Sequence, residues 1–369
     1  LSRYFECFAL DGTGEFPRLQ LASLAGDQFP EGDKARRFSR EHGVPIFATP
    51  RAALTLGTDS LAVDAVFLIA EHGRYPESDT GQFIYPKRAM FEQVARVCEA
   101  SGRSVPLFLD KHLADNWQDA KWIYDEARRL RMPLMAGSSL PVLWRDPAVD
   151  VERDAALAEI LVLSYGRLDS YGFHACEIAQ CLAERRLGGE TGVRRVRALR
   201  GAAAWKACED GRVDRDLLAL AKKRFHKRPI SPVKPLQEQV PDPALFMIEH
   251  ADGLRVNILA LPDLFIDWTA AWRYADGRRE AAVFWTQEAR PFSHFGLLLR
   301  HIESFMESGT PPWPVERTLL TTGILDAALV SRRDRGEVIE TPHLNVAYRS
   351  AWNWAEPPPP APDRPIQGQ

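Results

Sequence analysis

The sequence predicts two domains of different class: an α/β domain with a doubly wound parallel sheet, then an α+β domain with a largely antiparallel sheet. A length of 369 residues exceeds what one hydrophobic core usually organises. Short apolar runs alternate with helical patterns in the first part of the chain, which is typical of βαβ units. Further on, two Asp-Gly pairs separate apolar segments, as in turns between antiparallel strands. We therefore place the domains at residues 1–140 and 141–355, followed by a proline-rich tail at 356–369 that we expect to be disordered.

The composition is that of a globular protein and argues against a nucleic-acid or membrane partner. Hydrophobic residues make up 45% and charged residues 26% of the chain, and the formal net charge is −3. The richest basic stretch, residues 222–228, lies at the end of a predicted helix, where a solvated helix end is expected. No segment reaches the run of about 18 apolar residues that a membrane span needs, and the N-terminus lacks a signal-peptide pattern. We expect a cytoplasmic protein.

The cysteines favour neither a disulfide framework nor a metal site. There are five of them, scattered along the chain. His174, Cys176 and Cys181 lie on one helical pattern without the second half of a metal-binding motif, so we expect buried thiols.

The first domain is predicted from four apolar runs and three helical patterns. The runs are residues 19–25, 63–70, 105–109 and 133–136, and the helices are 32–42, 87–100 and 117–130. Residues 63–70 are apolar almost without interruption, which predicts a central strand covered on both faces. Residues 117–130 carry one apolar stripe, and Asp115 followed by Gln118 resembles a capping box that sets the start of this helix.

The second domain is predicted from Asp252-Gly253 and Asp276-Gly277, each of which lies between strand-like segments. The predicted strands are residues 245–250, 254–261, 266–274 and 280–286, and the predicted helices are 171–185, 214–225, 292–306 and 315–332.

Polar residues follow each predicted strand of the first domain, where ligands bind in a doubly wound sheet. These residues are Asp27, then Glu71-His72-Gly73, then Asp110-Lys111-His112, then Gly137-Ser138-Ser139. An acid in the place of Asp27 can hold adenosine ribose hydroxyls, or it can simply cap a turn. Lys111 could stabilise an alkoxide formed in hydride transfer, or it could be an ordinary surface lysine.

A predicted helix at the start of the second domain carries the remaining candidates. Asp169, Ser170 and Tyr171 open it, and His174 and Glu177 follow one turn apart on one face. Such a pair can form a proton relay or a capped helix end. Histidine has the intrinsic pKa to accept a hydroxyl proton near neutrality.

These residues, in this order, resemble the Gfo/Idh/MocA family, named for glucose-fructose oxidoreductase and inositol dehydrogenase. The family carries an acid after its second strand, a Glu-Lys-Pro after its fifth, and an Asp and a His close together on a helix of the second domain; Asp27, Lys111, Asp169 and His174 fall in those places. The resemblance continues through residues 294–306, Gly309-Thr310-Pro311 and residues 315–331, so that it spans nearly the whole chain.

The resemblance implies a Rossmann-type first domain, an NAD or NADP cofactor, a sugar or polyol substrate and a homo-oligomer formed through an exposed sheet face. It implies catalytic roles for Lys111 and His174, with Asp169 or Glu177 orienting His174. The cofactor would lie near Asp27, Glu71, His72, Gly73, Asp110 and Ser138, and the substrate near Ser139, Tyr171 and Glu177. The Asp27 carboxylate favours NAD because it repels a 2′-phosphate, although Arg36 and Arg37 keep NADP open.

Three departures from the family pattern stand out. The Glu-Lys-Pro position reads Asp110-Lys111-His112, and Asp169 and His174 are five residues apart where the family usually shows four. No G-x-G-x-x-G precedes the first predicted strand, and Gly12 and Gly14 lie in a polar segment. We therefore expect that the first strand and its phosphate loop are missing from this chain, with residues 1–10 a remnant of the first helix.

The sequence leaves three functional hypotheses. The first is an NAD(P)-dependent oxidoreductase that acts on a secondary hydroxyl of a sugar, inositol or related polyol. The second is a non-catalytic metabolite-binding or regulatory protein that keeps the fold without cofactor turnover. The third, metal-dependent hydrolysis by His72, His112 and His174, has no supporting ligand spacing.

Overall fold

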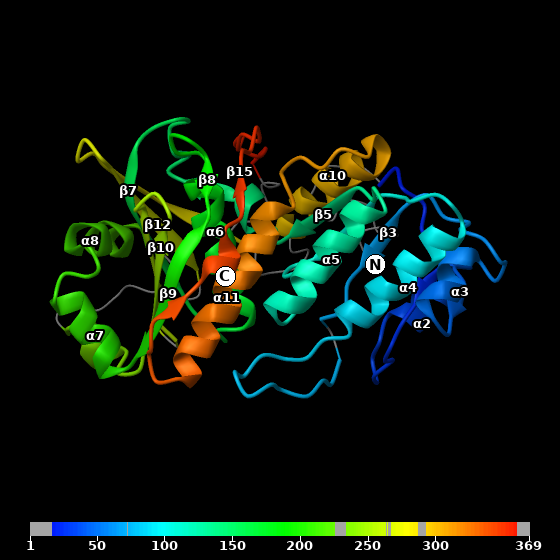
Figure 1. The fold of residues 1–369 in the computed structure, drawn as a ribbon, viewed down its shortest axis with the longest axis horizontal. Coiled ribbons are helices and arrows are strands. Elements are labelled where there is room, and N and C mark those ends of the chain that lie inside the picture. The colour runs from blue at the N-terminus through cyan, green and yellow to red at the C-terminus, as the bar shows by residue number, and fades with distance from the viewer. Residues whose placement is uncertain are drawn as a thin grey trace.

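The computed structural model describes residues 17–71, 73–225, 234–262, 264, 267–286 and 293–359. The two predicted regions lie side by side along the longest axis, with helices α6 (Ser170–Ala183) and α11 (Glu316–Arg333) between the large sheet and the N-terminal region (Figure 1). The N-terminal segment expected to be a helix remnant, residues 1–10, lies outside the described residues.

The first domain is built on short parallel strands. Strands β3 (Val66–Leu68), β4 (Leu107–Asp110) and β5 (Leu134–Gly137) form one parallel sheet in that order, and β1 (Leu24–Ala25) pairs with β2 (Ile46–Phe47) in a second. The helices are α2 (Ala35–His42), α3 (Pro50–Thr55), α4 (Lys87–Ala100) and α5 (Trp117–Arg129). The prediction of a parallel α/β domain is confirmed.

Three details of the first domain differ from the prediction. Strand β3 lies at the edge of its sheet rather than at the centre, so that Ile69 just beyond it is 56% exposed, and β4 is the middle strand. Strand β2 and helix α3 were not predicted. Helix α5 is capped by Asn116, whose Oδ1 accepts a hydrogen bond from the N–H of Asp119 at 2.9 Å, and not by Asp115.

The second domain contains an eight-stranded sheet, in the order β14-β9-β10-β11-β7-β12-β13-β6. Every pairing is antiparallel except that of β11 with β7. Its strands are β6 (Trp144–Asp146), β7 (Leu157–Ser164), β9 (Val193–Arg200), β10 (Ala244–His250), β11 (Arg255–Ala260), β12 (Trp268–Tyr274), β13 (Arg279–Trp285) and β14 (Ile339–Glu340). A separate pair joins β8 (Glu190–Thr191) to β15 (Ala347–Tyr348). The predicted α+β domain with a largely antiparallel sheet is therefore confirmed.

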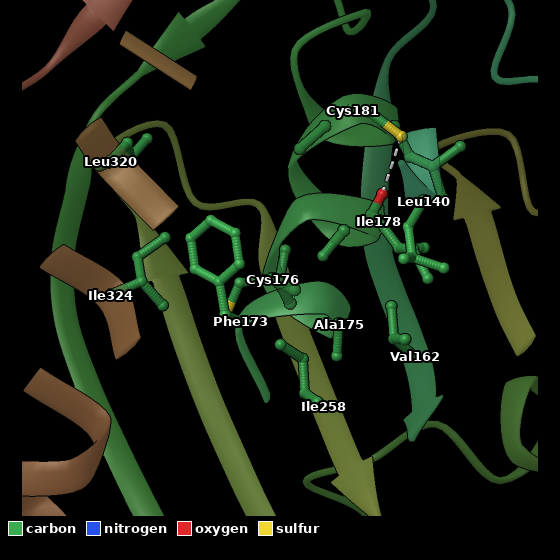
Figure 2. Packing of buried hydrophobic residues seen from close by; sticks show 14 of the residues in the cluster. Leu140, Val162, Phe173, Ala175, Cys176, Ile178, Cys181, Ile258, Leu320 and Ile324 are labelled. Atoms are coloured by element: carbon green, nitrogen blue, oxygen red, sulfur yellow. Dashed lines mark hydrogen bonds between the residues drawn. The ribbon is translucent and has the colours of Figure 1, made fainter. Parts of the chain in front are cut away.

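The inner face of the large sheet packs against α6, which is itself covered by α11. Figure 2 shows Phe173 and Ala175 of α6 among Val162 and Ile258 of the sheet and Leu320 of α11. These side chains are almost completely removed from water, and burial of each large apolar side chain contributes about 1.5–3 kcal/mol. The core fixes α6, and with it the direction of the polar residues at its N-terminal end.

The outer face of the sheet is covered by helices of the same chain. Leu161 and Leu259 are buried against α7 (Ala202–Glu209) and α8 (Arg215–Arg224), with the short α9 (Leu236–Gln239) nearby. The homo-oligomer was expected to form through an exposed sheet face, and the structure shows this part of the face to be occupied. Oligomerisation itself stays a prediction.

The C-terminal segment returns to the start of the second domain. After α10 (Ser293–Ser308), α11 and the 3-10 turn η3 (Pro342–Leu344), the chain passes the turn η2 (Leu140–Val142). The indole Nε1 of Trp144 donates to the carbonyl oxygen of Pro358 at 2.8 Å, and residues 360–369 of the predicted tail lie outside the described residues. None of the described helices combines the length and apolarity needed to cross a bilayer.

Candidate active site

Lys111 follows β4 directly, and its ammonium is held by carboxylates. The Nζ atom lies 2.7 Å from Oε2 of Glu71 and 3.8 Å from Oδ2 of Asp110, and the side chain is 19% exposed. Burial by itself lowers the pKa of Lys111, but the negative charges of Asp110 and Glu71 outweigh burial and raise it above the usual range. Lys111 is therefore a permanent cation that keeps an edge open to a ligand.

Glu71, after β3, gathers three basic groups around one buried carboxylate. Its Oε1 lies 2.5 Å from Nζ of Lys87 and 3.1 Å from Nδ1 of His112, and its side chain is 3% exposed. Burial raises the pKa of this carboxyl, but the charges of Lys87, His112 and Lys111 together bring it well below the ordinary value. Glu71 is thus ionised and links β3 to the end of β4.

His174 lies one turn into α6 among aromatic rings. Its ring centroid is 5.6 Å from that of Trp268 and 6.2 Å from that of Tyr171. Its buried Nδ1 finds no hydrogen-bond partner in the part of the chain that the structure describes. Burial, and next the charge of Lys111, lower the pKa of His174 to about 3. The imidazole is therefore neutral at pH 7, and its pKa lies well below the near-neutral intrinsic value of histidine on which the sequence prediction was based.

Asp169 caps α6 and does not orient His174. Its carboxylate accepts from the backbone N–H of Ser170 at 2.8 Å and from Nε of Arg167 at 3.4 Å. The alternative of a capped helix end, left open by the sequence, therefore describes this residue.

Glu177 is also turned away from His174. It is fully buried and accepts from the N–H of Ser138 at 3.3 Å and from the hydroxyls of Thr318 and Thr321 at 3.2 and 2.9 Å. Burial raises its pKa above the ordinary value. Glu177 joins β5 to α11, and the expected roles in orienting His174 and in binding substrate do not fit this position.

Other candidates are distributed around this centre. Ser138 and Ser139 are 1% and 4% exposed, so their side chains offer a ligand little surface. Tyr171 stacks on Trp268 at a centroid distance of 5.7 Å with 16° between the ring planes. His72 lies outside the described residues.

Asp27, after β1, is exposed, and it approaches the loop after β3. The hydroxyl of Tyr75 donates to its Oδ2 at 3.1 Å, and burial followed by this carboxylate raises the pKa of Tyr75 to about 12. Gln28 exchanges two hydrogen bonds with the backbone of Arg74, one residue after Gly73, at 2.9 and 3.1 Å. The ends of β1 and β3 thus meet at one edge of the domain, as expected for a ligand site.

Residues 77–83 form an interdomain strap that starts after β3 and crosses to the second domain (Figure 1). Glu77 pairs with Arg167 at 2.9 Å, and the guanidinium of Arg167 lies 4.4 Å above the ring of Phe83. The carbonyl oxygen of Thr80 accepts from Arg332 of α11 at 2.7 Å. The strap thus joins the first domain to Arg167 and to α11 of the second.

Sequence reasoning missed two residues of the site. Lys87 was placed only at the start of a helix, yet its side chain is completely buried beside Glu71. Tyr85 lies with its ring 5.9 Å from that of His112, and burial, followed by the charges of Glu71 and Asp169, raises its pKa to about 12. Only the unusual polarity at the start of α4 hints at Lys87 in the sequence.

The described residues give no support to a metal site. Among them, no group of three or more His, Cys, Asp or Glu side chains is arranged to hold a metal ion. His112 is buried and His174 is half-buried, and removal from water lowers the pKa of each.

Comparisons with known proteins find no matching family model and no matching curated protein. Solved structures do match. GenD2 from gentamicin A biosynthesis, in complex with NAD, is 16% identical with a TM-score of 0.55, over 90% of this chain and 92% of that chain. Myo-inositol dehydrogenase from Lactobacillus casei, in complex with NAD(H) and myo-inositol, is 11% identical with a TM-score of 0.54, over 86% of this chain and 88% of that one.

A third match is myo-inositol 2-dehydrogenase from Lactobacillus plantarum, at 10% identity and a TM-score of 0.54, over 92% of this chain and 97% of that chain. At these identities the likeness establishes the fold. The chain therefore has the two-domain fold that the resemblance to the Gfo/Idh/MocA family implied.

Proposed function

We propose that this protein is an NAD(P)-dependent oxidoreductase that transfers hydride between nicotinamide and a secondary hydroxyl or ketone of a sugar, inositol or related polyol. The observation that carries the proposal is the permanent Lys111 cation at the end of β4, whose charge acts on the neutral ring of His174 on α6. Among the described residues, Nδ1 of that ring finds no hydrogen-bond partner. GenD2 and the Lactobacillus casei enzyme share the fold and bind NAD or NAD(H). The proposed site of action is the cytoplasm.

The described residues fit one end of a dinucleotide. Asp27 is exposed at the end of β1 and would hold the adenosine ribose, which favours NAD over NADP. Arg36 lies over the ring of Phe29 at 4.8 Å and Arg37 pairs with Glu41 at 3.6 Å, so neither guanidinium is committed to a phosphate. When bound, the nicotinamide supplies the hydride acceptor or donor. The chain contains no G-x-G-x-x-G to cradle the pyrophosphate, so the phosphate end has no counterpart among these residues.

Lys111 and His174 would each interact with the reacting oxygen of the substrate. The ammonium of Lys111 would donate a hydrogen bond to that oxygen and stabilise the negative charge it develops. The neutral imidazole of His174 would hydrogen-bond the reacting hydroxyl and orient it; with its pKa lowered to about 3, the ring is a weak base. Each contribution of this kind is worth about 10²–10⁴-fold in rate.

The test is a titration of the protein with NADH and NADPH, followed by nicotinamide fluorescence, and then a screen of cyclic polyols and aldoses with oxidised NAD or NADP as the hydride acceptor. We expect NADH to bind more tightly than NADPH and at least one polyol to be oxidised. A protein that binds neither nucleotide and turns over no polyol would overturn the proposal.

A second candidate is a metabolite-binding or regulatory protein without turnover. It is favoured by the pairing of Glu71 with all three basic neighbours, Lys87, Lys111 and His112. A rise in melting temperature with myo-inositol or a sugar, without any change on addition of NADH, would favour this candidate.

A further inference from the structure

Lys87 opens helix α4 and is buried to an unusual degree for a lysine. Its side chain is 0% exposed, and its Nζ donates to Oε1 of Glu71 at 2.5 Å, to the carbonyl oxygen of His112 at 2.6 Å and to that of Asp110 at 3.2 Å. An ammonium has three N–H donors, and here each has an acceptor.

The position of Lys87 in the first turn does not stabilise helix α4 itself. The first turn of a helix presents its partial positive charge, so a cation there is unfavourable. Burial adds a desolvation cost that is offset only by good pairing. The position of Lys87 is therefore explained by its acceptors rather than by the helix on which it lies.

The two carbonyl acceptors of Lys87 flank Lys111 on both sides. Lys111 has a φ of 56°, in the left-handed region that residues other than glycine rarely adopt. Its N–H donates to the carbonyl oxygen of Gly137 at 3.1 Å, which ties the same turn to β5. Such conformations persist only where the surroundings hold them, and they cluster at active sites.

The side chain of Lys111 is connected to Lys87 as well. Glu71 receives Lys87 on Oε1 and Lys111 on Oε2, at 2.5 and 2.7 Å, so one carboxylate bridges the two ammonium groups. Both the main chain and the side chain of Lys111 are thus held by groups that Lys87 binds.

We propose that Lys87 is a positioning residue for Lys111: it holds the carbonyl groups of the two neighbouring residues, Asp110 and His112, and through Glu71 it fixes the place of the Lys111 ammonium. The inference rests on the proposed function, in which Lys111 acts on the reacting oxygen. Lys87 itself is enclosed and touches no ligand; it acts only through Lys111 and Glu71.

The test compares Lys87→Met, which keeps the length of the side chain and removes its donors, with Lys121→Met on the exposed face of α5. Lys121 is 43% exposed, and its Nζ pairs with Asp125 of the same helix at 2.6 Å. Folding of each variant is verified by circular dichroism and urea unfolding before any other measurement.

The first readout is independent of turnover. The charge of Lys111 acts on His174, so a displaced ammonium changes the titration of that ring. In protein labelled with [13C]histidine, we expect Lys87→Met to raise the pKa of His174 by about 1, in the direction that removal of Lys111 produces. Lys121→Met should leave the titration as in the wild type.

The second readout is kinetic. With an active polyol and NAD, we expect Lys87→Met to lower kcat about 10²-fold, as for a displaced catalytic group, with KM for NAD nearly unchanged. Lys87→Gln retains two donors for the carbonyl oxygens, so its kcat should fall less than that of Lys87→Met. If Lys87→Met does not fold, Lys87→Gln takes its place. We then expect a smaller rise in the pKa of His174 and a smaller loss of kcat.

An unchanged His174 titration in a folded Lys87 variant would overturn the proposal and leave Lys87 a structural ion pair. If the wild-type protein shows no turnover while the His174 titration shifts as expected, the proposed function fails and the positioning role stands.

Discussion

Burial and the charges of neighbouring groups together set the charge states of Lys111 and His174. Burial lowers the pKa of both groups. For Lys111 the carboxylates of Asp110 and Glu71 outweigh burial, whereas for His174 the charge of Lys111 adds to it. At neutral pH the site therefore holds a cation and a neutral imidazole, and the cation can stabilise an oxyanion.

Removal of the Lys111 charge tests this arrangement. In Lys111→Met we expect the pKa of His174 to rise from about 3, because loss of a nearby positive charge favours the imidazolium form. We also expect turnover of an active polyol to fall about 10²–10⁴-fold. The measurements are an NMR titration of the histidine ring and steady-state kinetics.

The matched control is again Lys121→Met, which should change neither quantity. A folded Lys111→Met protein whose His174 titrates as in the wild type would contradict the electrostatic description of the site.

At the scale of elements, α6 and α11 are joined by a completely buried ion pair. The guanidinium of Arg317 donates to both carboxylate oxygens of Glu184, at 2.5 and 2.9 Å, and both side chains are 0% exposed. Tyr348 of β15 donates to the same carboxylate at 2.8 Å. This pair connects the helix that carries His174 to the helix that reaches the interdomain strap.

Breaking the pair should cost more than removing a surface pair. We expect Arg317→Met to lower the free energy of unfolding by about 3–5 kcal/mol, because it leaves the Glu184 carboxylate buried without its counter-charge. The double variant with Glu184→Gln should recover part of this loss. Urea denaturation followed by tryptophan fluorescence measures both.

Arg200→Met provides the comparison, since Arg200 and Asp242 form an exposed pair. We expect it to change stability by at most about 1 kcal/mol. Equal losses for Arg317→Met and Arg200→Met would show that burial of the pair has no energetic consequence.

At the scale of the whole molecule, each domain contains a buried carboxylate held in its ionised form. These are Glu71 in the first domain and Glu190 in the second, where Glu190 lies 3.0 Å from Nδ1 of His250 and 3.1 Å from Arg186. Burial opposes ionisation of each, but the neighbouring basic groups outweigh it and lower both pKa values.

Lowered carboxyl pKa values make the protein sensitive to acid. The ionised carboxylates stabilise the folded state fully at any pH above the carboxyl pKa of the unfolded chain, about 4.3. This stabilisation is lost as the pH falls toward the pKa that each carboxyl has in the folded state. His174, whose pKa is also lowered, is neutral in the folded state and adds to the loss below about pH 6.5. We expect the free energy of unfolding to fall by several kcal/mol, about 2 per carboxylate, between pH 6 and pH 3.

Urea unfolding of Glu190→Gln at several pH values tests whether the buried carboxylates cause this loss of stability in acid. The variant should be less stable at pH 6 and less dependent on pH below 5, because one titrating group is gone. Glu31→Gln, at an exposed position, should follow the wild type. A Glu190→Gln curve parallel to the wild type would contradict the assignment.

The sequence by itself determined the fold class, the order of the pieces and the ends of the strands at which polar residues gather. Hydrophobic periodicity gave α4 at its observed bounds and α5 to within a residue, because these helices have a continuous buried stripe. Strands β7 and β9 were not predicted, since β7 is buried on both faces like a helix segment, and four of the eight residues of β9 are arginines.

Only the tertiary structure decided which polar residues act together. Glu177 and His174 share a helix face in the sequence pattern, yet packing of α6 against β5 and α11 turns Glu177 to the hydroxyls of Thr318 and Thr321. Lys87 belongs to the site because the start of α4 lies next to the end of β4, where Nζ of Lys87 binds the carbonyl oxygen of Asp110. The two residues are more than 20 positions apart in the sequence. Periodicity reports which face of an element is buried; it does not report which charges meet there, because that depends on contacts between segments distant in sequence.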